Sequence, residues 1–267
     1  MIVQGPAWGP SVEYLEKTLG PLLRQWRPHF YAPRNTPGGM RVIEDASQAS
    51  DKLAADLEVQ RQGLGVEKAI RVGHSHGALL ALAYAIKYPD RVAALVLLAP
   101  SVDAPGTNRE SAAVLEEFRG DPWRRAAIEC WDRDAQLRGS VADDRALARR
   151  LRVLAPLNFW CRTALEEFQN SLRHTSPPSS AALAGMPAAP ESWIRAGLAE
   201  VVAPVLCVAG RHDFLTPPAA AFAVSSKLRA GRLLVVDHAG HNPWVERPAA
   251  VGDAILAFLQ REIRTQA

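Results

Sequence analysis

The segment Val72-Gly73-His74-Ser75-His76-Gly77 constrains the fold of this chain more than any other part of the sequence. An apolar run precedes it and an apolar helical pattern follows, so it is typical of a sharp turn from a strand into a helix. The turn is so tight that the residues beside it must be small, which accounts for Gly73 and Gly77. It would lift the Ser75 hydroxyl above a sheet at a helix N-terminus, where the N–H of His76 can face a developing oxyanion. The segment therefore predicts a nucleophilic serine.

Short apolar runs alternate with helical patterns along the rest of the chain. Most of these runs are continuously apolar, which is typical of parallel strands that are covered on both faces. Helical patterns such as Asp51–Gly63 and Ala78–Lys87 lie between them. The alternation predicts an α/β fold with a mostly parallel, doubly wound sheet. The expected strands are Met1–Gln4, His29–Tyr31, Ala69–Val72, Val92–Leu98, Val205–Ala209 and Leu233–Val236.

The alternation stops after Pro100, and no strand pattern returns before Val205. We expect residues 101–203 to be a helical insertion in a core made of residues 1–100 and 204–267. A connector rich in Ser, Pro and Ala, His174–Pro190, leads to a short helix near Ser192–Glu200. The other expected helices of the insertion are Glu110–Arg119, Pro122–Leu137, Asp143–Val153 and Asn158–Arg173.

Two further segments can complete a catalytic site around the serine. A serine is a weak nucleophile, so it needs a general base and an acid that orients the base. Gly210-Arg211-His212-Asp213 and His238-Ala239-Gly240-His241 each follow an expected strand. The carboxyl ends of parallel strands are where such sheets build their sites, and serine, acid, histidine is a known chain order. We therefore predict a triad of Ser75, Asp213 and His241.

Other titratable residues in these segments remain alternatives. His238 lies nearer to the strand end than His241, and Asp237 competes with Asp213 as the acid. A hydrogen-bonded loop residue and a loop brace are the simpler interpretations of His238 and Asp237. We expect the remaining histidines beside the triad to shape the pocket or hold loops; they are His74, His76 and His212.

A second oxyanion donor is expected from the turn Gln4-Gly5-Pro6-Ala7-Trp8-Gly9-Pro10, which follows the first strand. Pro6 has no N–H and cannot serve. Gly5 is the best candidate, because only glycine lets the backbone approach a ligand closely. The predicted oxyanion hole is therefore formed by Gly5 and His76, although a plain Gly/Pro turn is the alternative. Trp8 either lines the pocket or simply packs.

These segments, together with Tyr84-Ala85-Ile86-Lys87-Tyr88-Pro89-Asp90-Arg91-Val92, resemble the α/β-hydrolase superfamily. The resemblance covers Met1 to about Ser101 and Ala203 to the end, and it does not extend through the insertion. It implies the α/β-hydrolase fold and a Ser-His-Asp mechanism without metal or cofactor, and it favours His241 over His238 as the base. The sequence begins at a core strand, so we expect the usual one or two leading strands of this fold to be missing.

Within the superfamily, the turn after the first strand is similar to the proline iminopeptidase-like branch, which has His-Gly-Gly-Pro-Gly there. Gly5-Pro6 matches the second Gly and the Pro, whereas Val3 and Gln4 replace the His and the first Gly. The elbow also departs from that branch, which tends to have Gly-Gly-Ser-Trp-Gly. Carboxylates for a substrate amine are available in Glu116-Glu117 and Glu166-Glu167, but paired helical glutamates are more typical of a solvated surface. Peptidase specificity therefore does not follow from the resemblance.

The sequence as a whole predicts a serine hydrolase that cleaves an ester, lactone, thioester or small amide through an acyl-enzyme. The same triad could instead serve carbon–carbon bond hydrolysis, acyl transfer, cyclisation in a biosynthetic pathway, or an iminopeptidase-type aminopeptidase. A non-catalytic binding protein is less favoured, because the predicted triad is complete. We expect the insertion to be a lid that presents apolar side chains to the substrate; the pocket candidates are Trp8, Trp123, Trp131, Phe159, Trp160 and Trp193.

Composition excludes several other classes of protein. With 48% hydrophobic and 22% charged residues in 267, the chain can bury one ordinary core. The basic cluster Arg149-Arg150-Leu151-Arg152 is short and lacks interleaved aromatics, so nucleic-acid binding is not expected. The three cysteines form no C-x-x-C pattern, and neither a signal peptide nor an apolar run of ~20 residues is present. We expect a cytoplasmic protein with a small-molecule substrate, no membrane span and no metal.

The expected edge strand, His29–Tyr31, bears on assembly. An exposed edge invites pairing with another chain, and a two-fold dimer is the commonest closed form. Pro28 and Pro33 bracket the strand and blunt that edge, which favours a monomer. Monomer and homodimer therefore both remain open.

Overall fold

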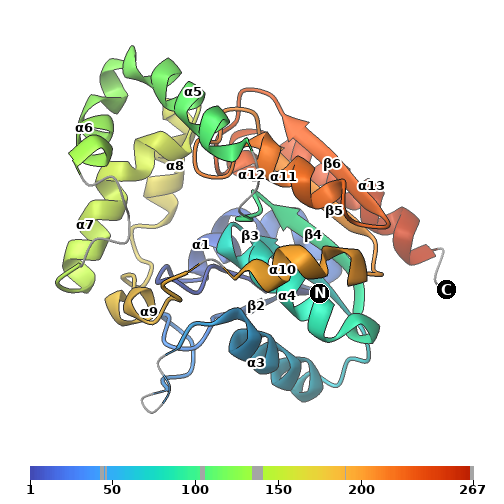
Figure 1. Cartoon of the computed structure of the whole chain (residues 1–267). Coiled ribbons are helices and arrows are strands. Elements are labelled where there is room, and N and C mark those ends of the chain that lie inside the picture. The colour runs from blue at the N-terminus through green and yellow to red at the C-terminus, as the bar shows by residue number, and fades with distance from the viewer. Residues whose placement is uncertain (43–44, 46, 103–105, 134–140, 190, 265–267) are drawn as a thin grey trace.

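The computed structural model describes the chain except for residues 43–44, 46, 103–105, 134–140, 190 and 265–267. A six-stranded sheet runs through its centre in the order β2-β1-β3-β4-β5-β6, and every neighbouring pair is parallel (Figure 1). All six predicted strands are confirmed. Their bounds are β1 Ile2–Gln4, β2 His29–Tyr31, β3 Ala69–His74, β4 Val92–Leu98, β5 Val205–Gly210 and β6 Gly231–Val236.

Helices cover both faces of the sheet, as the continuous apolar runs predict. Leu95 and Leu97 of β4 belong to the core on one face, whereas Val96 and Leu98 belong to the core on the other. Both kinds of position must therefore be apolar, and no polar alternation can appear in the sequence of this strand. On the first face lie α3 (Ser50–Gly63), α4 (His76–Lys87) and α11 (Pro218–Ser225); on the second lie α1 (Glu13–Thr18), α2 (Gly20–Leu23) and α13 (Pro248–Arg264).

Strand β1 is interior, because it pairs with both β2 and β3. β2 therefore forms one edge of the sheet, as expected for His29–Tyr31, with β6 at the other edge. β1 starts at Ile2, the second residue of the sequence.

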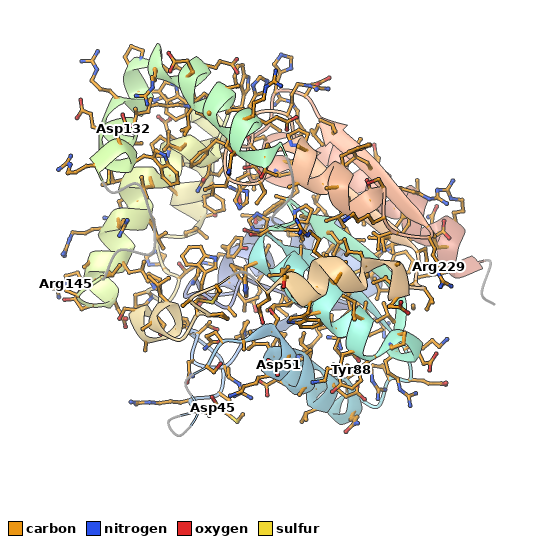
Figure 2. All side chains as sticks on the ribbon, in the orientation of Figure 1. Asp45, Asp51, Tyr88, Asp132, Arg145 and Arg229 are labelled. Carbon is orange, nitrogen blue, oxygen red and sulfur yellow. The ribbon has the colours of Figure 1, made fainter. Side chains whose placement is uncertain are left out.

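The described part of residues 101–203 contains helices and no strand. Helices α5 (Thr107–Arg119), α6 (Arg125–Arg133), α7 (Asp144–Leu154) and α8 (Arg162–Ser171) stand beside the sheet as a separate group (Figure 1). Charged side chains such as those of Asp132 and Arg145 lie on the outer side of this group (Figure 2).

Two of the helices expected in this region have other bounds in the structure, and one helix was not predicted. The expected helix Pro122–Leu137 is divided into the 3-10 turn η3 (Pro122–Arg124) and α6, and its last four residues lie outside the described residues. The expected helix Asn158–Arg173 starts late, because η4 (Ala155–Asn158) is followed by extended backbone at Phe159 and Cys161. The connector contains an unpredicted helix, α9 (Ser180–Ala184), whose N-terminus is capped by the side chain of Ser179.

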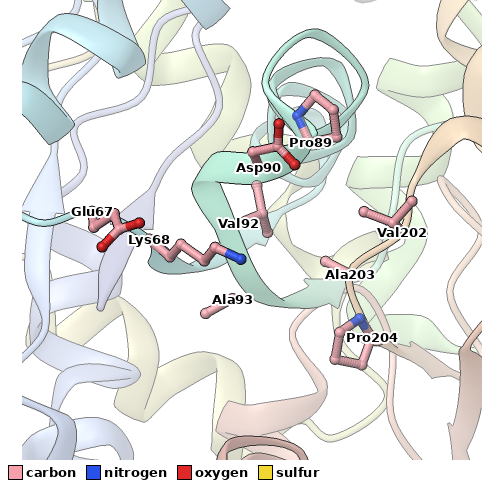
Figure 3. Close-up of a pocket in the computed structure, with 9 residues that line it drawn as sticks. All are labelled: Glu67, Lys68, Pro89, Asp90, Val92, Ala93, Val202, Ala203 and Pro204. Atoms are coloured by element: carbon pink, nitrogen blue, oxygen red, sulfur yellow. The ribbon is translucent and has the colours of Figure 1, made fainter. Parts of the chain in front are cut away.

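The strand register brings the ends of distant segments together. Gln4 pairs with Gly73, His74 with Leu98, and Gly210 with Val236. Because all strands are parallel, the loops after β1, β3, β5 and β6 meet at the carboxyl edge of the sheet. At the opposite, amino edge there is an open hollow of about 590 Å³ lined by Glu67, Lys68, Pro89, Asp90, Val92, Ala93, Val202, Ala203 and Pro204 (Figure 3).

Candidate active site

Ser75 stands at the turn between β3 and α4 in a strained backbone conformation. Its φ is 55° and its ψ is −120°, a region that non-glycine residues rarely occupy and that clusters at functional sites. A Cβ on Gly73 would come within 2.3 Å of the Gly77 carbonyl oxygen, and one on Gly77 within 2.4 Å of the Gln4 oxygen. Both glycines are therefore required by close backbone approach, as the sequence predicts. The serine is half-buried at the head of α4.

The structure brings Asp213 and His241 into contact, although they lie on different loops. His241 Nδ1 is 2.7 Å from Asp213 Oδ2. Asp213 is fully buried and His241 is 5% exposed, so the pair is screened from water. Because a carboxylate only accepts, Nδ1 carries the hydrogen and donates it to Asp213. In the neutral ring Nε2 is then without a proton. The pair can therefore take up a proton at Nε2 and stabilise the imidazolium that results.

Four donors hold the Asp213 carboxylate. Its Oδ1 accepts from the backbone N–H groups of Leu215 at 2.9 Å and Thr216 at 3.0 Å. Its Oδ2 accepts from the Thr216 hydroxyl at 2.7 Å as well as from His241. Burying a carboxylate is costly unless it is hydrogen-bonded, and this loop supplies three of the four bonds within three residues of Asp213. Thr216 was not singled out from the sequence, although its place three residues after Asp213 is typical of such a turn.

His74 connects the elbow to the loop of His241. Its Nε2 is 2.9 Å from the His241 carbonyl oxygen, and its Nδ1 is 2.6 Å from the Tyr14 hydroxyl. Burial lowers the pKa of His74 well below its usual value, so the ring is neutral. A carbonyl only accepts, so Nε2 donates to His241 and Nδ1 accepts from Tyr14. The residue before Ser75 thus anchors the backbone of His241, in keeping with the loop-holding role expected for it.

The expected oxyanion turn is attached to the same elbow. His76 Nδ1 accepts from the Ala7 backbone N–H at 3.3 Å, which holds the turn after β1 against the start of α4. A Cβ on Gly77 would lie 3.0 Å from the Gly5 carbonyl carbon, so Gly5 packs closely on the elbow. His76 is the first residue of α4, where backbone N–H groups have no partner inside the helix. Among the described residues, the buried His76 Nε2 has no hydrogen-bond partner.

The competing residues are arranged differently. His238 is exposed and has a positive φ of 52°, and Asp237 forms an ion pair with Arg211. His212 stacks on the ring of Trp160 with centroids 3.8 Å apart and is 3.2 Å from Glu117. The Asp237–Arg211 pair fits the loop brace expected of Asp237, whereas the His238 ring contacts the rings of Trp160 and His212.

Four of the five pocket candidates from the insertion fall into two packing clusters. Trp131 meets Phe214 edge-on at 5.0 Å, and Trp160 belongs to the same cluster. Phe159 is buried, and Trp123 packs in its cluster. Trp193 does not join them: it is 36% exposed on α10 (Ser192–Ala196), a helix that contacts α4. Trp8 is half-buried in the turn after β1.

The insertion reaches the predicted base through residues that sequence reasoning missed. Asn158 accepts from the His241 backbone N–H at 2.9 Å. The buried carboxylate of Glu246, at the end of α12 (Pro243–Glu246), bonds both to the insertion and to Gly240. The sequence shows that Glu246 lies close to His241 in the chain, but it contains no signal for the partner of Glu246 in the insertion, Cys161.

Neither a metal cluster nor a membrane helix is found in the described residues. Groups of three or more His, Cys, Asp or Glu that could hold a metal ion do not occur there. Likewise, none of the helices described is both long and apolar enough to cross a membrane. Cys130, Cys161 and Cys207 are free thiols.

Two family models match separate parts of the chain. Residues 12–128 match a model described as alpha/beta hydrolase fold, and residues 179–263 match one described as TAP-like protein. The matched ranges include the elbow and the loops of Asp213 and His241.

Curated relatives include two bacterial enzymes. The chain is 32% identical over 183 residues to a pimeloyl-[acyl-carrier protein] methyl ester esterase of Nitrosomonas europaea, an alignment that covers 66% of this chain and 65% of the esterase. The chain thus spans slightly less than two thirds of that relative. It is 24% identical over 254 residues to a putative carbamate hydrolase of Caulobacter segnis, which covers 94% of this chain and 88% of that protein.

Solved structures share the fold over nearly the whole chain. An esterase from Thermogutta terrifontis superposes with a TM-score of 0.65 at 21% identity, covering 98% of this chain and 89% of the esterase. A meta-cleavage product hydrolase from Pseudomonas fluorescens gives a TM-score of 0.68 at 16% identity, and the superposition covers 97% of this chain and 90% of the hydrolase. At these identities the likeness concerns the fold alone. With its parallel sheet, its strained serine elbow and both family matches, the chain belongs to the α/β-hydrolase superfamily.

Proposed function

We propose that this protein is a serine hydrolase that cleaves a small ester, or a chemically related lactone, thioester or amide, through an acyl-enzyme. The observation that carries the proposal is the buried Asp213–His241 hydrogen bond, joined through His74 to the strained elbow of Ser75. The matched family and the esterase and hydrolase among its relatives support the same class of reaction.

Each residue has a distinct role in the proposed mechanism. Ser75 Oγ attacks the substrate carbonyl while His241 Nε2 takes its proton, and Asp213 stabilises the imidazolium. The backbone N–H groups of Gly5 and His76 would donate to the tetrahedral oxyanion. His241 then returns the proton to the leaving group and activates the water that hydrolyses the acyl-enzyme. The side chain of His76, by bonding Ala7, would keep the two donors in register.

Ester cleavage is favoured over the aminopeptidase alternative because three of the four glutamates considered for amine binding already have partners. Glu116 pairs with Arg119, Glu117 contacts His212, and Glu166 pairs with Arg162. These carboxylates already have partners near the surface, so they are poor candidates for binding a substrate amine. The aromatic clusters of the insertion, by contrast, suit an apolar acyl or alcohol group. We propose residues 101–203 as the lid that selects this group.

The first test is labelling and substitution of Ser75. Ser75→Ala should remain folded and lower hydrolysis of para-nitrophenyl esters by at least about 10³-fold, because triad residues act as a unit. A fluorophosphonate should label Ser75 of the wild type, and Ser226→Ala, on the surface at the end of α11, should be labelled normally. A parallel panel of amino-acid naphthylamides compares ester with peptidase activity. Labelling at another serine, or activity retained in Ser75→Ala, would refute the assignment.

A further inference from the structure

Glu246 is a buried carboxylate that joins the insertion to the loop of the proposed base. It is 6% exposed. Its Oε1 accepts from the backbone N–H of Cys161 at 2.7 Å, and its Oε2 accepts from the backbone N–H of Gly240 at 2.6 Å. Cys161 belongs to the insertion, and Gly240 immediately precedes His241. One side chain therefore holds two segments that are 79 residues apart in the chain, from 161 to 240.

The backbones of these segments also touch directly. The His241 N–H donates to the Asn158 carbonyl at 2.9 Å. A Cβ on Gly240 would lie 2.6 Å from the Asn158 oxygen and 3.2 Å from the Phe159 Cα. Only glycine permits this approach, since any side chain would push the insertion away from the loop. The segment 158–161 thus forms one wall against which the loop of His241 rests.

Arg124 holds the same segment from the other side. Its guanidinium donates to the carbonyls of Phe159 at 2.7 Å, Trp160 at 2.9 Å and Pro156 at 3.3 Å, and it is 1% exposed. The carbonyls of Phe159 and Trp160 lie between two helical segments, so they accept from Arg124 rather than from a helix N–H. The extended stretch at Phe159–Cys161 is therefore fixed between the guanidinium of Arg124 and the carboxylate of Glu246.

Stability alone does not account for a charged group at this position. Burial raises the pKa of Glu246 to about 7, even though N–H donors of Gly240, Cys161 and Trp160 and the charge of Arg247 lower it. Arg124 also attracts the carboxylate electrostatically. The ionised form that accepts from both segments is therefore costly to bury at neutral pH. What it provides is a rigid link between two backbones.

We propose that Glu246 is a positioning residue that clamps segment 158–161 to the Gly240–His241 loop and thereby sets the location of the general base. The inference rests on the proposed function, because it takes His241 as that base. Glu246 acts through backbone N–H groups rather than on the substrate. A displacement of a catalytic group by about 1 Å can cost on the order of 10²-fold in rate, so a clamp of this kind has a measurable effect.

The clamp is tested by Glu246→Gln, with Glu246→Ala as a second variant. Glutamine has the same size, but its amide NH₂ would face one of the two N–H donors, so one bond is lost. We expect kcat on a para-nitrophenyl ester and the rate of fluorophosphonate labelling at Ser75 to fall together by about 10- to 100-fold, with KM within about threefold. Amide hydrogen exchange should accelerate at Gly240, His241 and Cys161 and remain unchanged in β4.

The matched control is Glu262→Gln. Glu262 lies on α13, and its partly buried carboxylate accepts from Arg232 at 2.6 Å. This variant should leave kcat, labelling and exchange at the clamp unchanged. If Glu246→Gln leaves kcat, labelling and local exchange as in the wild type, the clamp is refuted. If the wild type itself is not labelled at Ser75, the proposed function fails. Amide hydrogen exchange at Gly240 and Cys161, compared between the wild type and Glu246→Gln, then still decides whether the clamp exists. If Glu246→Ala does not fold, Glu246→Gln carries the test alone.

Discussion

His241 is held at three different atoms by three different parts of the molecule. Asp213 bonds its Nδ1, Asn158 bonds its backbone N–H, and His74 bonds its carbonyl oxygen. The proposed base, fixed in this way, would lose little entropy when the reaction begins, because its orientation is already set. His238, three residues earlier, is exposed in the left-handed region of backbone conformations.

The two histidines should therefore differ sharply under substitution. His241→Ala should lower kcat by at least about 10⁴-fold, because it removes the proton acceptor of the proposed triad. His238→Ala should change kcat by less than about tenfold, since His238 is exposed and has no place in the proposed triad. Ester hydrolysis measured on both variants, with circular dichroism to confirm folding, compares them directly. Equal losses in two folded proteins would leave the base unassigned.

At this scale the sequence could identify residues whose role follows from their neighbours in the chain. Ser75, Asp213 and His241 each come just after an apolar strand, so their arrival at one edge of the sheet could be predicted. Thr216 and Glu246 contribute by bonds that depend on how loops fold back. The link from Glu246 to Cys161 spans 85 residues and carries no periodicity or spacing signal.

At the scale of elements, strands were easier to predict than the helices of the insertion. A strand buried on both faces is apolar throughout, so β4 and β5 are visible as runs. The helices of the insertion are short and are interrupted where backbone groups find partners outside the helix. Around Phe159 the chain leaves the helical conformation because its carbonyls bond Arg124 instead. That exchange of partners could not be seen in the amphipathic pattern.

Arg124 should accordingly be a stabilising residue of the insertion. Arg124→Met keeps an unbranched side chain but removes the guanidinium, which lies over the rings of Phe118 and Trp123, donates to three carbonyls and pairs with Asp121. We expect the free energy of unfolding to fall by about 2–4 kcal/mol, because buried carbonyls lose charged partners. Urea denaturation measures the change.

Arg119→Met is the matched control, since Arg119 forms ion pairs with Glu116 and Asp132 at the surface. Exposed pairs contribute little, so the free energy of unfolding of this variant should stay close to that of the wild type. Equal losses for the two arginine variants would show that the carbonyl bonds of Arg124 do not hold the insertion.

For the whole molecule, the parallel sheet separates two ends of different character. The carboxyl edge gathers the strained elbow, the buried Asp213–His241 pair and the insertion, whereas the amino edge carries the open hollow with Glu67, Lys68 and Asp90. The interior place of β1 and the edge place of β2 were expected from the family resemblance, whereas the full order of the six strands was not predicted. A lid over the serine was expected of the insertion, but the polar contacts that attach it to the carboxyl edge, such as those of Glu246, were not, because they join segments far apart in the chain.

That attachment should be visible in the pH dependence of global stability. The pKa of Glu246 is raised from 4.5 to about 7 in the folded protein, so the native state holds its proton more strongly than the unfolded chain does. The resulting stabilisation is complete below pH 4.5 and is lost as pH rises through about 7. Between pH 5 and pH 8 the wild type should lose roughly 2–3 kcal/mol of unfolding free energy that Glu246→Gln does not lose.

Urea denaturation of both proteins at the two pH values measures this difference. Every other titrating group is common to the pair, including Arg124 and Arg247 near the carboxylate, so their contributions cancel in the comparison. Parallel pH profiles for wild type and variant would mean that Glu246 is ionised in the folded protein as easily as in water. A difference that grows with pH in the expected sense would mean that the protein keeps a carboxylate in its interior at a cost in stability, at the point where the insertion meets the loop of the proposed base.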